Sequence, residues 1–371
     1  RNGRHGICLT SSLNNTIVGN VITANNRYGI SLQFVNGSII SGNNIANNYY
    51  GMYFDESHCN TIIGNVITAS KYYGIHIYLS SGNCIVANTI ATNDDHGIYL
   101  RRCTGTNISK NSITGNKING VDVYNSSSNT IIRNNLTKNK DDGISFYNSF
   151  NNKICGNNIS LNSDGGISLS FSSYNNISEN ALISNDDGIG LYGSFNNNIY
   201  HNNFVENTNQ WYSYASANVW DNDVEGNYWD DYDGVDLDHD GIGNRWYEID
   251  ENNTDRYPLM GMFHSFETSL GYYVNVISNS TIEDFEYFGS NRTIRMRISN
   301  VTENQTFGFC RVCIPKDLMS PPYTVIIDDG LTEVLHFDET ICANSTHRWI
   351  YFDYEYPVNE IAIISYYSDY S

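Results

Sequence analysis

The chain has 371 residues and a formal net charge of −20 at pH 7, from 40 acidic and 20 basic side chains. Such a surface repels phosphates, so we expect no nucleic-acid partner. The 29 tyrosines, 15 phenylalanines and 5 tryptophans exclude an unfolded chain. No apolar run approaches the ~18 residues of a spanning helix, so we expect no transmembrane segment.

Residues 1–209 contain a repeat, in which a glycine followed by an aliphatic residue recurs every 22 or 23 positions. These glycines are Gly6, Gly29, Gly51, Gly74, Gly97, Gly120, Gly143, Gly166 and Gly188. Counting each glycine as zero, positions +1 and +3 are apolar and +2 is mostly polar, which is strand alternation. No segment shows a helical period. The repeat therefore predicts an all-β fold: a right-handed parallel β-helix of about nine ~23-residue coils, followed by a small β-sandwich domain.

Asparagine is unusually abundant, with 55 residues concentrated before position 210. Position +14 is asparagine in every repeat: Asn20, Asn43, Asn65, Asn88, Asn111, Asn134, Asn157, Asn180 and Asn202. In stacked coils each amide donates to the next asparagine and accepts from the one before. We interpret this row as a structural ladder, and ligand binding by these amides is the alternative.

The repeat resembles the parallel β-helix repeat family, in particular NosD-like proteins of archaeal surfaces, over about residues 3–262. The resemblance implies an extracellular or cell-surface protein. It leaves the function open because this fold hosts lyases, hydrolases, epimerases, adhesins and inert surface proteins. The NosD name suggests copper, but the nine histidines are scattered along the chain and no metal-ligand motif groups them. We therefore expect no copper.

Residues 210–262 lose the repeat and contain Trp211, Trp220 and Trp229, which predicts a cap on the C-terminal end of the β-helix. Within this segment the D-x-D-x-D-G pattern is typical of a calcium loop, because alternate carboxylates converge on one hard cation. The predicted ligands are Asp236, Asp238, Asp240 and Asn244. A solvated acidic turn is the alternative.

Residues 263–371 contain alternating apolar stretches that predict about seven strands, as in a β-sandwich. The stretch from Gly308 to Pro315 resembles a small Ig-like module of archaeal surface proteins. Glycosylation sequons in this part predict an exported glycoprotein. They are Asn279, Asn291, Asn300, Asn304 and Asn344.

One corner of the repeat resembles the sites of β-helix polysaccharide enzymes. Asp94, Asp95 and His96 bring two carboxylates and an imidazole together before Gly97, and paired carboxylates catalyse glycoside hydrolysis. Because Asp-Asp-Gly recurs in other coils, we interpret this corner as structural and keep it as a weak catalytic candidate. Outward tyrosines on the same sheet suit a protein interface, cross-strand pairing or glycan binding.

Our leading hypothesis is therefore a non-catalytic extracellular structural protein that self-associates into a filament, sheath or surface layer. The first residues run directly into a full coil, and we expect its uncovered edge to be covered either by an N-terminal segment missing from this chain or by a second copy, of which we favour the second copy. The alternatives are a polysaccharide-active enzyme (lyase, hydrolase or epimerase) and a glycan-binding adhesin.

Overall fold

The computed structural model describes residues 3–328, 332–333 and 345–365. Every named element in these ranges is a strand, and they contain no helix long and apolar enough to cross a membrane. The chain divides into two compact units. The first comprises the residues up to Asn222 together with Glu248–Asp255, and the second comprises Asp223–Tyr247 together with the residues from Arg256 onward.

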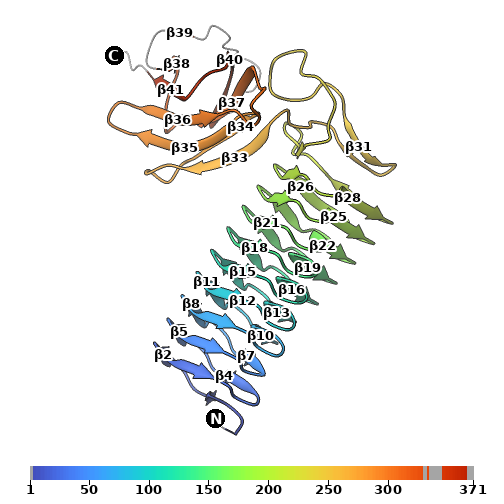
Figure 1. Ribbon diagram of the computed structural model, residues 1–371, viewed down its shortest axis with the longest axis vertical. Helices are drawn as coiled ribbons and strands as arrows, with labels where there is room; N and C mark the ends of the chain where they lie inside the picture. The colour runs from blue at the N-terminus through green and yellow to red at the C-terminus, as the bar shows by residue number, and fades with distance from the viewer. Residues whose placement is uncertain (1–2, 329–331, 334–344, 366–371) are drawn as a thin grey trace. The chain divides into compact units, whose positions relative to one another are not determined.

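The first unit is a right-handed parallel β-helix, which confirms the predicted fold class (Figure 1). Each coil contributes one strand to each of three parallel sheets. The first sheet contains, in order, β1 (Ile7–Thr10), β4 (Tyr28–Gln33), β7 (Tyr50–Asp55), β10 (Ile75–Tyr78), β13 (Ile98–Arg101), β16 (Val121–Tyr124), β19 (Ile144–Tyr147), β22 (Gly165–Ser170), β25 (Asp187–Tyr192) and β28 (Asn209–Tyr214).

The other two sheets consist mostly of three-residue strands. The second contains β2 (Thr16–Val18), β5 (Ile39–Ser41), β8 (Thr61–Ile63), β11 (Cys84–Val86), β14 (Asn107–Ser109), β17 (Thr130–Ile132), β20 (Lys153–Cys155), β23 (Asn176–Ser178), β26 (Phe195–Tyr200) and β29 (Ala217–Val219). The third contains β3 (Val21–Thr23), β6 (Asn44–Ala46), β9 (Val66–Thr68), β12 (Thr89–Ala91), β15 (Ser112–Thr114), β18 (Asn135–Thr137), β21 (Asn158–Ser160), β24 (Ala181–Ile183) and β27 (Asn203–Val205).

The coils stack in register, so each repeat position forms a row along the β-helix. The isoleucines at +11 lie inside, and Ile85, for example, pairs with Ile62 and Ile108 and is fully buried. The repeat glycine is needed because a Cβ at Gly120 would lie 2.6 Å from the carbonyl oxygen of Gly143. The first sheet has one coil more than the nine glycines predict, since Gln210 occupies the glycine position in the tenth.

Buried asparagines link successive coils by hydrogen bonds. Asn134 accepts hydrogen bonds from the backbone N–H and the amide of Asn111, both at 2.9 Å. Its own amide donates to Asn157 Oδ1 at 3.0 Å and to the Ile108 carbonyl at 2.9 Å. Similar ladders run through position +19 and, with a serine and a threonine among the asparagines, through position +9. The +9 ladder, which our sequence analysis missed, continues from Asn197 through Asn218 to Asn253.

The second unit contains two antiparallel sheets that share one hydrophobic core, which includes Val276, Met296, Val312, Phe352 and Ile363. One sheet has the order β33 (Met262–Glu267), β34 (Tyr273–Ser278), β37 (Phe307–Pro315) and β40 (His347–Glu355). The other has the order β35 (Thr281–Phe288), β36 (Thr293–Ser299), β41 (Glu360–Ser365), β38 (Tyr323–Ile327) and β39 (Thr332–Glu333). Of the remaining short strands, β30 (Tyr228–Trp229) belongs to the second unit, whereas β31 (Tyr247–Asp250) and β32 (Asn253–Asp255) pair with each other and lie almost entirely in the first.

The ladder can be tested by shortening one rung. Asn134→Ala leaves the donors of Asn111 and the Ile108 carbonyl without their partner inside a dry stack, and an unpaired buried polar group costs about 1–3 kcal/mol. We expect the free energy of unfolding, measured by denaturant titration, to fall by roughly 3 kcal/mol. The control is Asn135→Ala at the adjacent exposed position, where we expect a change within about 0.5 kcal/mol. Equal effects of the two substitutions would contradict the ladder's role.

Candidate functional site

The corner before β13 and the strand β16 bring an imidazole between two carboxylates. Nε2 of His96 lies 3.4 Å from Asp95 Oδ1 and 3.8 Å from Asp122 Oδ2. These two oxygens are therefore at most 7.2 Å apart, the sum of those distances. All three side chains are only 15–19% exposed. The sheet register produces this cluster, because Asp122 is paired with Tyr99, just after the corner that carries Asp95 and His96.

Hydrogen bonds fix the protonation of His96. The backbone N–H of Asn119, one coil further on, donates to His96 Nδ1 at 3.2 Å. Burial lowers the pKa of His96 to about 4, so the ring is neutral near pH 7. With Nδ1 as acceptor, the single ring proton lies on Nε2 and points toward the carboxylates. The Asn119 amide also donates to Asp122 Oδ2 at 3.1 Å.

The two carboxyl groups are shifted toward their protonated forms. Burial raises the pKa of Asp122 to about 6, and the negative charges of Asp95 and Asp141 add to the shift, while the Asn119 hydrogen bond opposes it. Burial also raises the pKa of Asp95, against a hydrogen bond from the His96 N–H. Below about pH 6 Asp122 therefore holds a proton that it can donate, as general acid catalysis requires.

Aromatic rings surround the cluster on its N-terminal side. The rings of Tyr73 and His96 are parallel within 3° at 5.6 Å, and His76 stacks on Tyr99 at 4.9 Å. A second row crosses the later coils. It contains Tyr124, Tyr147, Phe171, Tyr192 and Tyr214, with successive ring centroids 5.1–5.8 Å apart. The outward tyrosines noted in the sequence thus form aromatic rows next to the carboxylates.

Of the three predicted catalytic candidates, the structure brings together two. Asp94 points away and pairs with Lys117 Nζ at 2.7 Å. Asp122 and Asn119 also belong to the cluster, and the repeat pattern alone did not predict them. The available signal was that Asp122 is the only carboxylate at position +2 of the nine repeats, where it replaces a small or aromatic residue.

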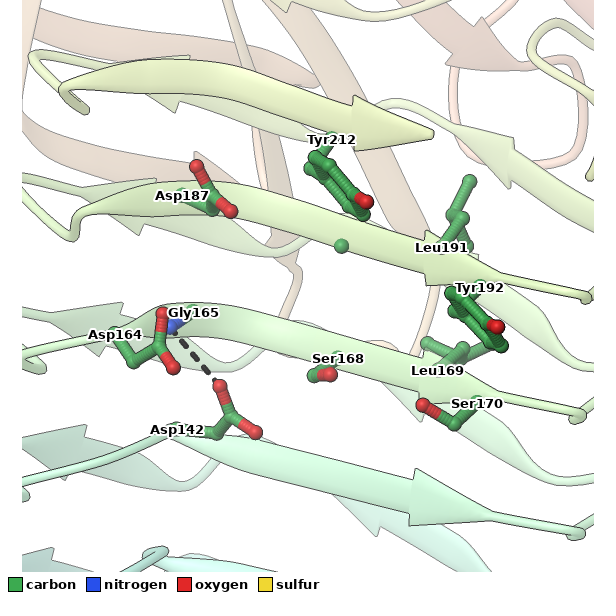
Figure 2. A pocket seen from close by; sticks show the side chains of 11 residues that line it. Asp142, Asp164, Gly165, Ser168, Leu169, Ser170, Asp187, Leu191, Tyr192 and Tyr212 are labelled. Carbon is green, nitrogen blue, oxygen red and sulfur yellow. Dashed lines mark hydrogen bonds between the residues drawn. The ribbon is translucent and has the colours of Figure 1, made fainter. Parts of the chain in front are cut away.

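A hollow of about 260 Å³ opens on the same face of the first sheet, around Ser168, which lies two coils beyond Asp122. Figure 2 shows Asp142, Asp164 and Asp187 near the start of the strands, with Tyr192 near their end and Ser168 between. Asp142 Oδ1 accepts a hydrogen bond from the Gly165 N–H at 2.9 Å. Burial raises the pKa of Asp142 to about 8, and the charges of Asp141 and Asp164 contribute to the shift.

The acidic loop lies in the second unit. Ligand oxygens of Asp236, Asp238 and Asp240 lie within 4.8 Å of one another. Asp236 accepts hydrogen bonds from the N–H groups of Asp240 and Gly241, and the Asn244 amide donates to Asp238 at 2.8 Å. This spacing fits a calcium ion, whose ligands are carboxylate and carbonyl oxygens.

A buried arginine holds this loop from the other side. Arg311 Nη1 donates to the Asp240 carbonyl at 2.8 Å and lies 3.9 Å from Asp240 Oδ2. Its Nε pairs with Glu225 at 2.9 Å. The guanidinium thus offsets part of the negative charge of the loop, and a bound cation has to share Asp240 with it.

The predicted glycosylation sites differ in their surroundings. Asn291, Asn300 and Asn304 are exposed. The Asn279 amide donates to the Phe307 carbonyl at 3.3 Å and its Oδ1 accepts from the Phe309 N–H at 2.9 Å, so this side chain is engaged with β37. Asn344 lies outside the described residues.

Two family descriptions match the chain. Residues 1–136 match "Right handed beta helix region" and residues 78–234 match "Periplasmic copper-binding protein (NosD)". Comparison with curated proteins found no match.

Solved structures with a similar fold include polysaccharide epimerases and a phage protein. A mutant of the periplasmic alginate epimerase AlgG is 18% identical, with a TM-score of 0.43, over 55% of this chain and 62% of that one. The A-module of the Azotobacter vinelandii mannuronan C-5 epimerase AlgE6 is 15% identical, with a TM-score of 0.48, over 54% and 64%. The Dettilon tailspike protein is 13% identical, with a TM-score of 0.46, over 96% and 86%. The chain thus spans less than two thirds of the first two structures.

The buried carboxyl at the hollow makes stability depend on pH. Asp142 has a pKa of about 8 in the folded protein, against 3.8 for a free side chain. Between these values the native state holds a proton that the unfolded chain has released, so the free energy of unfolding falls as pH rises. Asp142→Asn removes this titration and keeps the acceptor for Gly165. We expect the variant's Tm to match the wild type near pH 4 and to exceed it by several degrees at pH 8.

The control for this experiment is Asp94→Asn, which neutralises an exposed carboxylate two coils away. Its Tm difference from the wild type should stay constant from pH 6 to pH 8. A Tm difference for Asp142→Asn that did not grow over this range would show that Asp142 is ionised throughout.

Proposed function

This chain is a parallel β-helix repeat protein, and we propose that it binds a polysaccharide along its first sheet and hydrolyses it between Asp95 and Asp122. The observation that carries the proposal is that both carboxyl groups approach His96 Nε2, at 3.4 Å and 3.8 Å, on the outward face of the sheet. Glycoside hydrolysis needs two carboxyl groups in different protonation states on either side of the scissile bond.

The environments of the two carboxyl groups suggest their roles. Asp122 is the more strongly shifted, with a pKa of about 6, and so acts as the acid that protonates the glycosidic oxygen. Asp95 acts as the carboxylate that activates water or attacks the sugar. His96 positions both, because its Nε2 proton lies between them.

The same geometry disfavours His96 as the base of a lyase or an epimerase. Those reactions abstract a proton from a sugar carbon and need a group with a free lone pair. His96 Nδ1 is already occupied by the Asn119 N–H and Nε2 carries the ring proton, so this imidazole has no lone pair to offer. The net charge of −20 also repels polyuronates. We therefore infer that the substrate is not a polyuronate.

The structural-protein hypothesis explains the asparagine ladders but gives no reason for a half-buried pair of carboxyl groups with raised pKa values. Burying such groups costs stability, and strongly perturbed pKa values gather at functional sites. For this reason we prefer the enzymatic alternative. The two hypotheses are compatible, because a rod that self-associates can still carry an enzymatic site on the outward face of its first sheet.

We propose that the protein acts outside the cytoplasm, on the cell surface or in the periplasm. The match to a family described as periplasmic supports this location, and so do the exposed sequons Asn291, Asn300 and Asn304. Polysaccharides of cell envelopes are present in the same compartments.

We also propose that the loop from Asp236 to Asn244 binds calcium and that the ion stabilises the second unit. The mutual spacing of three carboxylates supports this, because without a cation their charges repel one another. The ion would be held by Asp236, Asp238 and Asp240, with the Asn244 side chain beside Asp238. Calcium here has a structural role and takes no part in the proposed hydrolysis.

The proposed hydrolysis predicts that Asp95→Asn and Asp122→Asn each lower kcat at least ~100-fold, because each removes one partner of the acid–base pair. Release of reducing ends from neutral and amino-sugar polysaccharides would be measured, with a polyuronate as the expected poor substrate. Activity should fall as pH rises through about 6, where Asp122 loses its proton.

The matched control is Asp94→Asn, since Asp94 is the neighbouring carboxylate outside the cluster. Its activity should remain within about twofold of the wild type. If no polysaccharide released reducing ends, or if Asp94→Asn were as impaired as Asp95→Asn, the proposal would fail.

Calcium binding predicts that a chelator lowers the Tm of the intact chain. A ligand that binds only the native state stabilises it by about 2.7 kcal/mol at one hundred times its Kd. Asp236→Asn and Asp240→Asn should abolish the response to calcium, whereas Asp233→Asn, which changes an exposed carboxylate outside the cluster, should preserve it. Melting curves that coincide with and without chelator would refute the site.

A further inference from the structure

Position +2 of the repeat forms an outward row along the middle of the first sheet, and this row has only small side chains in three successive coils. From Asp122 the paired positions are Ser145, Ser168 and Gly190, and the next is Tyr212. Before Asp122 the same row contains Tyr53, His76 and Tyr99. Two of these small residues, Ser168 and Gly190, line the hollow, and Tyr212 lies at its end.

The two sides of this hollow differ in chemistry. On one side lie the carboxylates of Asp142, Asp164 and Asp187, and on the other lies the ring of Tyr192 (Figure 2). Tyr192 is 43% exposed and Tyr212 is 50% exposed. Tyr212 has no ring contact among the described residues, so its ring is open to a ligand. The volume of the hollow, about 260 Å³, is just below the ~300 Å³ of the smallest ligand pockets. It suits one sugar ring, with the adjacent sugar units of the polymer lying outside the hollow.

The charge of the hollow is one-sided. Its lining contains three aspartates and no lysine, arginine or histidine. Carboxyl oxygens of Asp141, Asp142 and Asp164 lie within 4.8 Å of one another. The negative charge of one ionised group therefore makes ionisation of the other two less favourable. A positively charged ligand group would relieve this repulsion, whereas a uronate would increase it.

We propose that this hollow binds an amino-sugar unit, with its ammonium group against the Asp164 carboxylate and the neighbouring Asp142 carboxyl and its ring against Tyr192 and Tyr212. An ionised carboxylate accepts hydrogen bonds from an ammonium group, and a protonated carboxyl beside it offers a further acceptor oxygen. A flat aromatic ring covers the apolar face of a sugar and also attracts cationic groups. Carboxylates and open rings meet here within one hollow, which distinguishes it from the Asp-Asp corners of other coils.

The hollow lies within reach of the reactive pair. Coils are stacked ~4.8 Å apart, and Ser168 is two coils beyond Asp122 in the same row. An extended sugar chain along the sheet therefore passes through the hollow with its next units beside Asp122. This part of the inference rests on the proposed hydrolysis, and it makes the substrate a polymer with free amino groups, such as a deacetylated hexosamine chain.

The test measures binding separately from cleavage. Asp122→Asn stops the proposed turnover, and calorimetry in this background compares a glucosamine tetramer, its N-acetylated form, cellotetraose and a uronate tetramer. We expect the glucosamine tetramer to bind at least ~tenfold more tightly than the other three, and raised salt to weaken it. Asp164→Asn should reduce this preference, and Tyr212→Ala should weaken binding of the glucosamine tetramer.

A second variant fills the hollow without disturbing the fold. A Cβ at Gly190 would meet only Ser168 Oγ, at 3.9 Å, so Gly190→Tyr fits the strand and occupies the hollow. We expect it to weaken binding of the glucosamine tetramer at least ~tenfold. The matched control is Ser160→Tyr, which places the same side chain on the third sheet, in β21, and should leave binding unchanged.

Three results would overturn the assignment: equal affinity for glucosamine and N-acetylglucosamine tetramers, unchanged affinity in Gly190→Tyr, or calcium binding that Asp164→Asn abolishes. The last result would place an inorganic ion at the carboxylates instead. If the amino-sugar preference is found but the wild type cleaves nothing, the hollow stands and the proposed hydrolysis falls. If the wild type cleaves neutral chains and Gly190→Tyr cleaves them equally well, only the hollow is refuted.

Discussion

The hydrogen bond from one buried asparagine amide to the next is the interaction on which the rest of this β-helix depends. Each link ties a corner to the equivalent corner one coil away, and the Asn134 amide also satisfies the Ile108 carbonyl. A coil with an extra or missing residue at such a corner would leave two buried hydrogen-bond donors and one buried acceptor without partners. The ladders therefore fix the register of all three sheets.

Fixed register turns each position of the repeat into a row, and the proposed site is built by changing rows locally. The +2 row changes from aromatic to Asp122 and then to small residues, while the corner row contributes Asp95 and His96. None of these changes touches the isoleucines inside, such as the fully buried Ile108 and Ile131. The surface can carry chemistry because the interior and the ladders supply the stability.

The periodic part of the fold was predictable because it follows from local rules. Glycine spacing and alternation predicted the parallel coils, and stacking of like residues predicted the row through Asn134. The cluster was not predictable in the same way, because Asp95 and Asp122 are 27 positions apart and are brought together only by strand pairing across coils. The protonation of His96 depends on a backbone N–H, which leaves no trace in the sequence.

The interval between Asp122 and Tyr212 has a consequence for how such a protein can vary. It is measured in whole coils, so inserting or deleting one repeat between them would move the aromatic end of the hollow by one strand spacing and leave every other contact of the pattern intact. Under the proposed function, homologous chains can therefore differ in the length of glycan they recognise by whole numbers of coils. In this architecture the number of repeats sets the distance between Asp122 and Tyr212, and recombination between repeats is enough to change that distance.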